Sequence, residues 1–344
     1  VVLYDIFEDY WDPGKPHFDQ VEIKGGGDAT SAARAVIVTG DADWAWNLQV
    51  EAEILTQMES SGNEGVLVLQ PGVSAERIMI NFADPRAEVD GAFSEPTTQH
   101  PIFQHWEARK AIDYSVRRDL IADELYGPGN VATANNLNVP QRFVPDLTWE
   151  YDLDKAREML AVIDFPAAFD NVNIVYSTSI NTVRQKNQEI VKEDLEQLGF
   201  VVELKSVDAS VYFASDAGNP DTYAHFYVDI TMYTNGPGSP YPIAWAERYR
   251  SDDIAEKANS WSGTNITRYS NPDYDVLHDQ ARVEIDEARQ IEIWHEMMTM
   301  VYDDVVEVPI VYRGGVAAAS NRLQGYTPSP WQSTTSDIKN WFAE

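Results

Sequence analysis

Residues 172–207, VNIVYSTSINTVRQKNQEIVKEDLEQLGFVVELKSV, carry the pattern that decides the fold class. The β-branched and aromatic run at 172–176 predicts a buried strand, and the apolar residues between 183 and 198 recur on one face of a helix that Gly199 ends. Residues 200–207 predict a returning strand. A strand, a helix and a second strand within about 35 residues form a βαβ crossover, which pairs its two strands in parallel. The chain is therefore predicted to be an α/β protein.

Residues 226–249, FYVDITMYTNGPGSPYPIAWAERY, predict a strand and loop of the kind that forms ligand sites. The run 226–233 favours a strand, and the glycines and prolines of 234–242 forbid regular structure. Trp245 and Tyr249 follow at once. A rigid strand that delivers an aromatic-rich loop is how α/β proteins build ligand sites at strand ends. An ordinary loop with core aromatics behind it is the alternative.

The remaining elements follow from hydrophobic periodicity, caps and turn signals. Residues 83–101 show no periodicity and are predicted to be a loop beside a lobe boundary. Further helices are predicted at 29–39, 50–58, 104–126, 152–161, 271–285 and 286–302, and further strands at 1–7, 21–24, 66–69, 77–82 and 305–311.

The charge balance excludes a sequence-independent nucleic-acid binder. The chain has 344 residues, of which 56 are acidic and 25 basic, and a formal net charge of −31. A protein that binds phosphate backbones needs a cationic face, and an anionic lipid surface would repel this chain. Because the carboxylates are scattered along the sequence, they indicate a heavily solvated acidic surface.

The sequence lacks the motifs of catalysis and metal binding. It contains no cysteine, so disulfides and thiolate chemistry are excluded. None of its six histidines forms an i, i+4 pair on a helix, and the glycines at 25–27 lack the lysine and spacing of a phosphate-binding loop. No stretch approaches the about 18 uninterrupted apolar residues that a membrane-spanning helix needs. We therefore predict no catalytic residue, no metal site and no cofactor.

Aromatic and amide side chains gather at the predicted strand ends. Trp44 and Trp46 are two residues apart, so they would point the same way from a strand. Aromatic walls with a few polar anchors suit reversible recognition of a small polar ligand better than catalysis. The predicted ligand-binding residues are Trp44, Trp46, Asn47, Tyr233, Thr234, Asn235, Tyr241 and Trp245.

Six segments resemble, in the same order along the chain, motifs of the family 5 extracellular solute-binding proteins of ABC importers. This family includes dipeptide-, oligopeptide- and nickel-binding members. YSNPDYD at 269–275 resembles the family's YSNPEYD, and VPIVYR at 308–313 resembles its VIPLYHR. The helix 106–126, which contains ARKAIDY, resembles its VRQAIDYAIDR. The other segments are 8–19, which contains EDYW, GKP and FD, 32–43, which contains GDAD, and 152–160, DLDKAREML.

The resemblance implies a two-lobed periplasmic-binding-protein-like fold (type II, cluster C-like), an α/β architecture of mixed sheets with helices on both faces. Lobe I would comprise residues 1–82 and 317–344, and the second α/β lobe residues 83–316. Family members carry an N-terminal portion before the tyrosine–tryptophan segment, and this sequence starts within a strand-like run. We therefore expect that portion to be absent, and we expect the fragment to bind ligand weakly or not at all.

The function implied is that of the substrate-binding component of an ABC importer. Such a protein would capture an oligopeptide-like solute between its two lobes and deliver it to the permease subunits. The resemblance also implies a periplasmic or extracellular location, with lipid anchoring through the absent N-terminus as a further expectation.

One departure from the family pattern bears on the ligand. In peptide-binding relatives an aspartate in the loop after the 226–233 strand pairs with the α-amine of the ligand. Here Ser239-Pro240-Tyr241-Pro242 carries tyrosine in place of that aspartate, and no acid occurs between Asp229 and Glu247. An oligosaccharide-binding transport protein of the same fold is therefore an alternative, and a secreted glycoside hydrolase is a second one, from another class.

Overall fold

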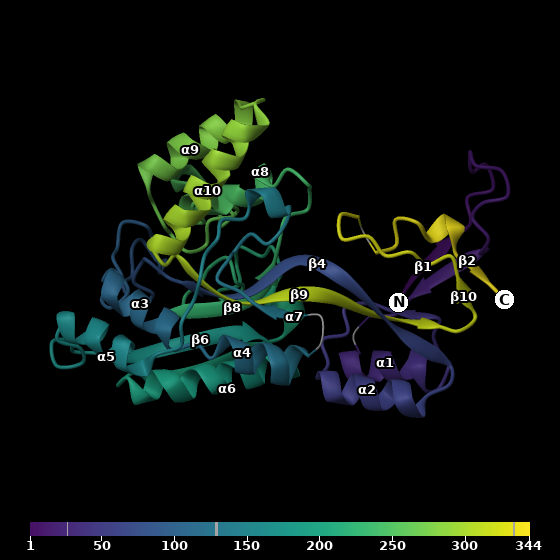
Figure 1. The fold of residues 1–344 in the computed structure, drawn as a ribbon, viewed down its shortest axis with the longest axis horizontal. Coiled ribbons are helices and arrows are strands. Elements are labelled where there is room, and N and C mark those ends of the chain that lie inside the picture. The colour runs from purple at the N-terminus through teal and green to yellow at the C-terminus, as the bar shows by residue number, and fades with distance from the viewer. Residues whose placement is uncertain (26, 128–129, 333) are drawn as a thin grey trace. The chain divides into compact units, whose positions relative to one another are not determined.

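The computed structural model describes residues 1–25, 27–127, 130–332 and 334–344, and these residues form two compact units (Figure 1). Unit 1 contains Val1–Gly72, a short segment beginning at Tyr126, and Arg313–Glu344. Unit 2 contains Val73–Leu125 and Asn130–Tyr312. The division falls inside two long strands, β4 (Gly65–Ile80) and β9 (Glu307–Ser320), each of which contributes residues to both units. The glycine turn expected at 25–27 includes Gly26, which lies outside the described residues.

The predicted βαβ crossover is confirmed in unit 2. It consists of β6 (Asn173–Ser179), α6 (Thr182–Gln197) and β7 (Val201–Val207), and β6 and β7 pair in parallel from Asn173 with Val201 to Ser179 with Val207. The side chain of Asn181 caps α6 by accepting the backbone N–H of Arg184. In Figure 1, α6 runs along one side of these strands.

The sheet of unit 2 is mixed, as the fold class predicts. β8 (Ile230–Asn235) pairs in parallel with β6 and in antiparallel with residues Ala75–Ile80 of β4. The strand order is β9-β4-β8-β6-β7, and the short β5 (Val131–Ala132) pairs with β9. α9 (Pro272–Val283) and α10 (Glu287–Asp303) lie on the side of the sheet opposite α6 (Figure 1).

The strand expected at 226–233 is displaced along the chain. β8 starts at Ile230 and continues through Asn235, because Phe226 has a positive φ of 50°, a conformation that breaks an extended strand. The Phe226 carbonyl accepts hydrogen bonds from Asn81 Nδ2 and Ser94 Oγ, both at 2.8 Å. At Phe226 these two side-chain donors therefore take the place of the backbone hydrogen bonds that pair neighbouring strands.

The single helix expected at 104–126 is in fact three pieces. They are α3 (Trp106–Tyr114), α4 (Arg118–Ile121) and the π-helical turn η1 (Ala122–Tyr126). The break allows the buried Arg118 to donate from Nε to the Pro309 carbonyl at 2.7 Å and to pair with Asp113. The sequence periodicity could not reveal a partner 191 residues away.

Two strands are longer than their sequences indicate. The expected strands 66–69 and 77–82 are one strand, β4, and the expected 305–311 strand continues as β9 to Ser320. Gly72 allows the continuation, since a Cβ at this position would meet the Arg313 carbonyl oxygen. Gly72 therefore permits the close approach of the backbone at Arg313 inside a continuous strand and does not mark a turn.

The core of unit 2 packs α9 and α10 against the loop that follows β8. Trp294, Met297 and Met298 are buried in it, as expected for the apolar face of α10. Asn271 caps α9, with Pro272 at the first helical position. The other elements of unit 2 are η2 (Gln141–Phe143), α5 (Leu153–Val162), α7 (Ala209–Tyr212), α8 (Ile243–Ala246), η3 (Glu247–Tyr249), η4 (Ser251–Asp253) and η5 (Lys257–Asn259).

Unit 1 packs two helices against short strands. α1 (Ala29–Ile37) is capped by Asp28, and it packs with α2 (Ala52–Ser61), β3 (Trp44–Ala45) and Ala318 of β9 around an aliphatic core. A separate antiparallel pair joins β1 (Val2–Asp5) to β2 (Gln20–Ile23). The remaining elements are β10 (Leu323–Gln324), η6 (Ile338–Asn340) and β11 (Phe342–Ala343).

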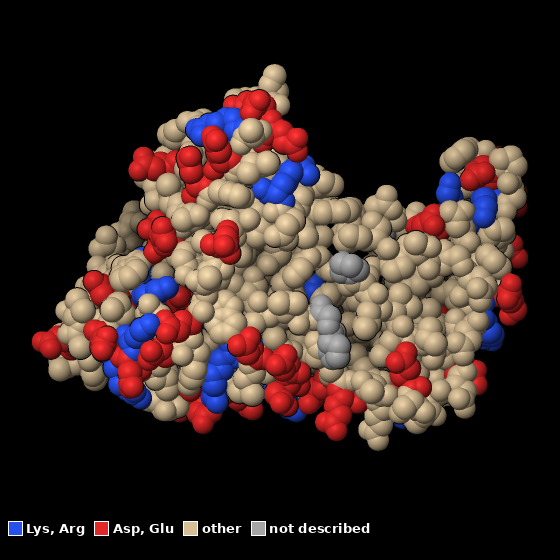
Figure 2. Space-filling view, in the orientation of Figure 1, with Lys and Arg blue, Asp and Glu red and all other residues tan. Residues whose placement is uncertain are grey.

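The surface is acidic, as the net charge predicts. Figure 2 shows carboxylates over α9 and α10 with fewer cationic groups among them. Within the described ranges, no helix has both the length and the apolar character needed to cross a membrane.

Candidate functional site

The candidate site lies where β8 ends in unit 2. Tyr233, Thr234 and Asn235 are its last residues, and they pair with Arg77, Glu76 and Ala75 of β4, respectively. β6 ends beside them, since the two strands run in parallel and Thr178 pairs with Met232. Strand ends of this kind are where open α/β sheets place their ligands.

A buried ion pair underlies Thr234. Arg184, from the first turn of α6, places Nε 3.0 Å from Oε1 of Glu76, and both side chains are at most 5% exposed. Thr234 Oγ1 donates to the other oxygen of Glu76, and Arg184 also donates to the hydroxyls of Ser179 and Thr234. The network joins β4, β6, β8 and α6, so it fixes the position of the strand ends.

A second buried ion pair underlies Tyr233 and Asn235. Arg77 Nε lies 2.7 Å from Oε2 of Glu307, and neither side chain is more than 3% exposed. The Arg77 guanidinium also donates to the Asn235 carbonyl at 2.9 Å and lies 5.7 Å from the centre of the Tyr233 ring. Burial by itself would lower the pKa of Arg77, but the interactions with Glu307, Tyr249, Tyr233 and Glu76 together outweigh burial and raise it. Arg77 is therefore cationic.

Tyr233 belongs to an aromatic cluster with Tyr212, Phe213 and Tyr223. Its ring centre is 5.2 Å from that of Tyr223 and 6.0 Å from that of Phe213, both in edge-to-face geometry. Tyr233 is only 6% exposed. The cluster holds the end of β8 rigidly and leaves little of the Tyr233 ring open to contact.

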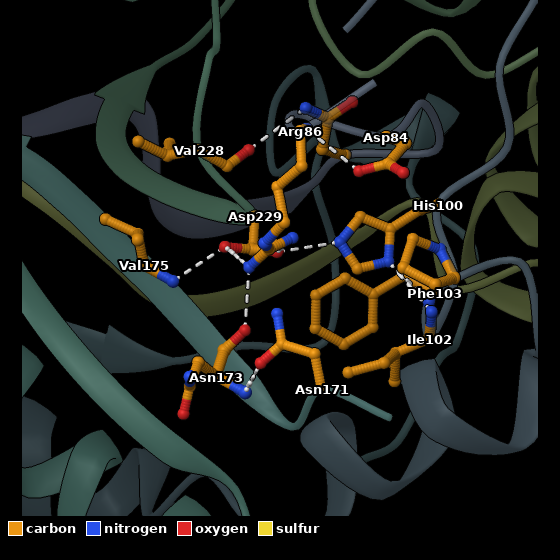
Figure 3. Close-up of polar contacts among 12 residues, drawn as sticks. Asp84, Arg86, His100, Ile102, Phe103, Asn171, Asn173, Val175, Val228 and Asp229 are labelled. Atoms are coloured by element: carbon orange, nitrogen blue, oxygen red, sulfur yellow. Dashed lines mark hydrogen bonds and ion pairs between the residues drawn. The ribbon is translucent and has the colours of Figure 1, made fainter. Parts of the chain in front are cut away.

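A further network anchors the opposite end of β8 (Figure 3). Asp229, just before the strand, accepts from both terminal nitrogens of Arg86, at 2.7 and 2.9 Å, and from the Val175 backbone N–H at 2.7 Å. Burial raises the pKa of Asp229, but hydrogen bonds from His100 and Arg86 outweigh this effect and lower it. Both carboxylate oxygens are thus occupied, and Asp229 has a structural role.

His100 is a neutral donor in this network. Its Nδ1 accepts the backbone N–H groups of Ile102 and Phe103 at 3.1 and 2.8 Å, so the ring proton resides on Nε2, which lies 2.9 Å from Asp229 Oδ1. Burial lowers the pKa of His100, which keeps the ring uncharged at neutral pH. Figure 3 shows the imidazole stacked on Phe103 and directed at the carboxylate.

The loop after β8 is held by Tyr241 and Trp245. The Tyr241 hydroxyl donates to the Ala281 carbonyl of α9, and its ring contacts Phe143 and Trp294 edge-on. Trp245 is 6% exposed and belongs to the same core cluster. These contacts give both side chains a packing role, with the ring of Tyr241 partly buried.

The three predicted site residues of unit 1 have different environments. Trp44 packs against Tyr326 and Trp341, with ring centres 6.1 and 5.6 Å away. Trp46 is 59% exposed, and Asn47 has a positive φ of 56° and accepts a hydrogen bond from Gln49. Because β3 ends at Ala45, the strand does not continue through both tryptophans.

The sequence reading missed the charged residues of the site. Glu76 and Arg77 lie inside a strand, where charged side chains usually face solvent, and their partners are far away in sequence. Arg184 had a usable signal, since it stands in the first turn of a helix that follows a strand. A residue in that position is close to the strand ends of a βαβ unit.

The comparisons with known proteins identify the family. The model of the bacterial extracellular solute-binding proteins, family 5 (middle), matches residues 1–255. The glutathione-binding protein GsiB of Escherichia coli strain K12 is 23% identical over 330 residues, which cover 94% of this chain and 58% of that protein. The chain therefore spans less than two thirds of the length of this relative.

Solved structures show the same fold. AgaA in complex with agropinic acid, from A. tumefaciens R10, matches with a TM-score of 0.79 and 18% identity, over 99% of this chain and 64% of its own. AppA from Bacillus subtilis in complex with a nonapeptide matches with a TM-score of 0.77 and 20% identity, over 99% of this chain and 64% of its own. NikA from Staphylococcus aureus in complex with Ni(L-His)2 matches with a TM-score of 0.77 and 18% identity, over 98% of this chain and 63% of its own. The expected periplasmic-binding-protein fold is thus confirmed, and the chain belongs to the family 5 bacterial extracellular solute-binding proteins, a family of binding proteins and not of enzymes.

Proposed function

We propose that this chain is the solute-binding component of an ABC importer and that it acts outside the cytoplasmic membrane. The family match over residues 1–255 is the observation that carries the proposal. In the proposed mechanism the protein closes around its solute and presents it to the permease subunits. Family membership removes the glycoside hydrolase from consideration.

The proposed solute is peptide-like. Two of the solved relatives, AppA and the Helicobacter pylori DppA, are complexes with peptides, and GsiB is named for glutathione, itself a peptide. These names give the oligosaccharide alternative no support. We retain Trp44, Trp46, Asn47, Tyr233, Thr234, Asn235, Tyr241 and Trp245 as the proposed contact set, in which Trp46 is the most exposed aromatic side chain.

Thermal unfolding of the full-length protein in the presence of defined ligands tests the proposal. The panel comprises a random pool of tri- to pentapeptides, the tetrapeptide STSA, glutathione, agropinic acid, and Ni(II) with L-histidine. A ligand that binds only the folded state, and is present at 100 times its Kd, adds about 2.7 kcal/mol to the free energy of unfolding. A gain of this size produces a readily measured rise in Tm. We expect the peptides to raise Tm and the nickel mixture to leave it unchanged. A response to Ni(II) with L-histidine alone would contradict the peptide proposal.

A further inference from the structure

One face of α9 holds the segment that follows β8. The site loop, residues 236–246, comprises the loop after β8 and the helix α8. It carries Tyr241 and Trp245 of the proposed contact set. Three side-chain hydrogen bonds join the site loop to α9, and the first is the bond already described, from the Tyr241 hydroxyl to the Ala281 carbonyl.

The other two bonds come from side chains of α9. Tyr274 Oη donates to the Ala246 carbonyl at 2.8 Å, and His278 Nε2 lies 3.1 Å from the Ile243 carbonyl oxygen. Tyr274, His278 and Ala281 stand at positions i, i+4 and i+7, so they share one face of the helix. All three residues are buried. α9 therefore holds the site loop at three points along one buried face.

The contacts of His278 determine which ring nitrogen carries the proton. Arg250 Nη1 lies 3.1 Å from His278 Nδ1. Because a guanidinium can only donate, Nδ1 must accept, and the ring proton resides on Nε2, which faces the Ile243 carbonyl. Both nitrogens of the neutral ring are thus satisfied, one by Arg250 and one by the site loop.

A protonated ring does not fit between these two partners. It carries N–H groups on both nitrogens, so Nδ1 would direct a proton at the guanidinium and two cations would be adjacent. Arg250 is held by Asp252, whose two oxygens lie 2.7 Å from Nε and Nη2, and by Asp279, which lies 2.7 Å from Nη1. The imidazole is held to the site loop by one bond to a carbonyl. The imidazole is therefore the group that protonation would displace, and its bond to Ile243 would be lost with it.

The charges around His278 favour the neutral ring at neutral pH. Burial lowers the pKa of His278 and the charges of Arg250 and Arg282 lower it further, whereas the Ile243 carbonyl and Glu247 oppose this shift. The ring therefore takes up its proton only below its ordinary pKa of 6.5. Further titratable groups beside the ring are Tyr274, Asp252, Asp275 and Asp279.

We propose that α9 positions the site loop for ligand binding and that His278 makes this positioning sensitive to acid. The neutral ring holds the loop at Ile243, and the protonated ring releases it, so the solute binds more weakly as the pH falls. The proposal rests on the proposed function and deepens it by adding regulation of the same site. His278 acts through the loop, as a positioning residue and not as a ligand-binding one.

Isothermal titration of the full-length protein at pH 7.0 and pH 5.0 tests the proposal. The probe is a pool of tri- to pentapeptides without histidine, whose terminal groups change charge little between these two pH values. Loss of one buried hydrogen bond corresponds to about a three- to tenfold loss of affinity, and we expect the wild-type protein to bind the pool that much more weakly at pH 5.0. Equal affinities at the two pH values would overturn the proposal.

Three variants separate the role of His278 from that of the other anchors. H278Q keeps an amide donor for the Ile243 carbonyl but does not titrate, so the ratio of its affinities at the two pH values should be less than about half the wild-type ratio. Y274F removes a second anchor and keeps the histidine, so it should bind more weakly at both pH values with the wild-type ratio. H295Q is the matched control, because it removes a histidine of α10 whose ring contacts the Arg142 carbonyl, and its ratio should equal that of the wild type. A folded H278Q with the wild-type ratio would overturn the role of His278.

The site loop can also be followed without a ligand, which separates this proposal from the proposed function. The ring ¹³Cε1–Hε1 signal of His278, assigned by its absence in H278Q or His278→Asn, gives the midpoint of its titration. We expect the backbone amide signals of Ile243 and Ala246 to shift with the same midpoint, below pH 6.5. Failure of every peptide to bind would contradict the proposed function but not this result. Amide signals that do not follow the His278 midpoint would overturn the proposal, whether or not a peptide binds.

Discussion

The guanidinium of Arg86 contacts both carboxylate oxygens of Asp229, Nη1 to Oδ1 at 2.7 Å and Nη2 to Oδ2 at 2.9 Å. Arg86 lies in the irregular segment that follows β4, and Asp229 immediately precedes β8. The same guanidinium donates to the Asn173 carbonyl at the start of β6. This one side chain therefore holds the loop to two neighbouring strands of the sheet (Figure 3).

Asp229→Asn should destabilise unit 2. The amide would place a donor where Arg86, His100 or the Val175 N–H already donates, and Arg86 would lose its counter-charge. We expect the free energy of unfolding to fall by about 2–4 kcal/mol, less than for a fully buried pair because Arg86 is partly exposed. Urea denaturation measures the change. Asp221→Asn removes an exposed carboxylate paired with Lys205 and should cost less than about 1 kcal/mol; a similar loss in both variants would argue against the network.

His100 should make stability depend on pH below neutrality. Its folded-state pKa lies below the ordinary value of 6.5, so the unfolded chain binds the proton first as pH falls. The contribution of the neutral ring is complete above about pH 6.5 and is lost as pH falls towards the folded-state pKa, at up to about 1.4 kcal/mol per pH unit. Tm measured between pH 7.5 and 5 checks this.

Comparison with H100Q isolates the histidine contribution. The variant should be less stable at pH 7.5 and should lose less stability on acidification than the wild type. His225 and His278 also have lowered pKa values because they are buried, so part of the dependence of stability on pH should remain in H100Q. Identical slopes for the two proteins would exclude His100 as a source of the pH dependence.

Glu76 and Arg184 should be strongly coupled. Removing either partner leaves a buried charge uncompensated, so E76Q and R184M should each cost about 3–5 kcal/mol. The double variant should cost clearly less than the sum, since it removes both charges. A double-mutant cycle by urea denaturation gives the coupling energy. Additive losses would mean that the two side chains contribute independently.

The Tyr241 hydroxyl should contribute to the stability of the loop after β8. Tyr241→Phe removes the donor to the Ala281 carbonyl and keeps the ring contacts with Phe143 and Trp294, so we expect a loss of about 1 kcal/mol. Tyr223→Phe is the matched control, because the Tyr223 hydroxyl has no hydrogen-bond partner among the described residues. Chemical denaturation of both variants distinguishes them, and an unchanged stability in Tyr241→Phe would remove the anchoring role.

Sequence reasoning succeeded where the determining interactions are local. The βαβ unit at 172–207 was predictable because periodicity, the stop at Gly199 and the length of the crossover all lie within one short stretch. The caps at Asp28, Asp152 and Asn271 were predictable for the same reason, since each side chain accepts from a backbone N–H two or three residues ahead.

Predictions failed where the partner of a residue is distant in sequence. The helix 104–126 breaks so that Arg118 can reach Pro309, and β8 starts late because Asn81 and Ser94 bind the Phe226 carbonyl. The strands expected at 66–69 and 77–82 are one strand, in which Gly72 lets the backbone at Arg313 approach closely. None of these partners can be inferred from the neighbouring residues.

The sequence by itself determined the α/β class, the crossover, the acidic surface and the family, because composition, local periodicity and collinear motifs carry that information. It also located the stretch 226–249 and showed that no acid occurs between Asp229 and Glu247. Only the tertiary structure decided which charges at the end of β8 are neutralised. Glu76 meets Arg184 across 108 residues, and Glu307 meets Arg77 from another strand. Charge pairing depends on distances of a few ångströms, and the folded chain alone sets those distances.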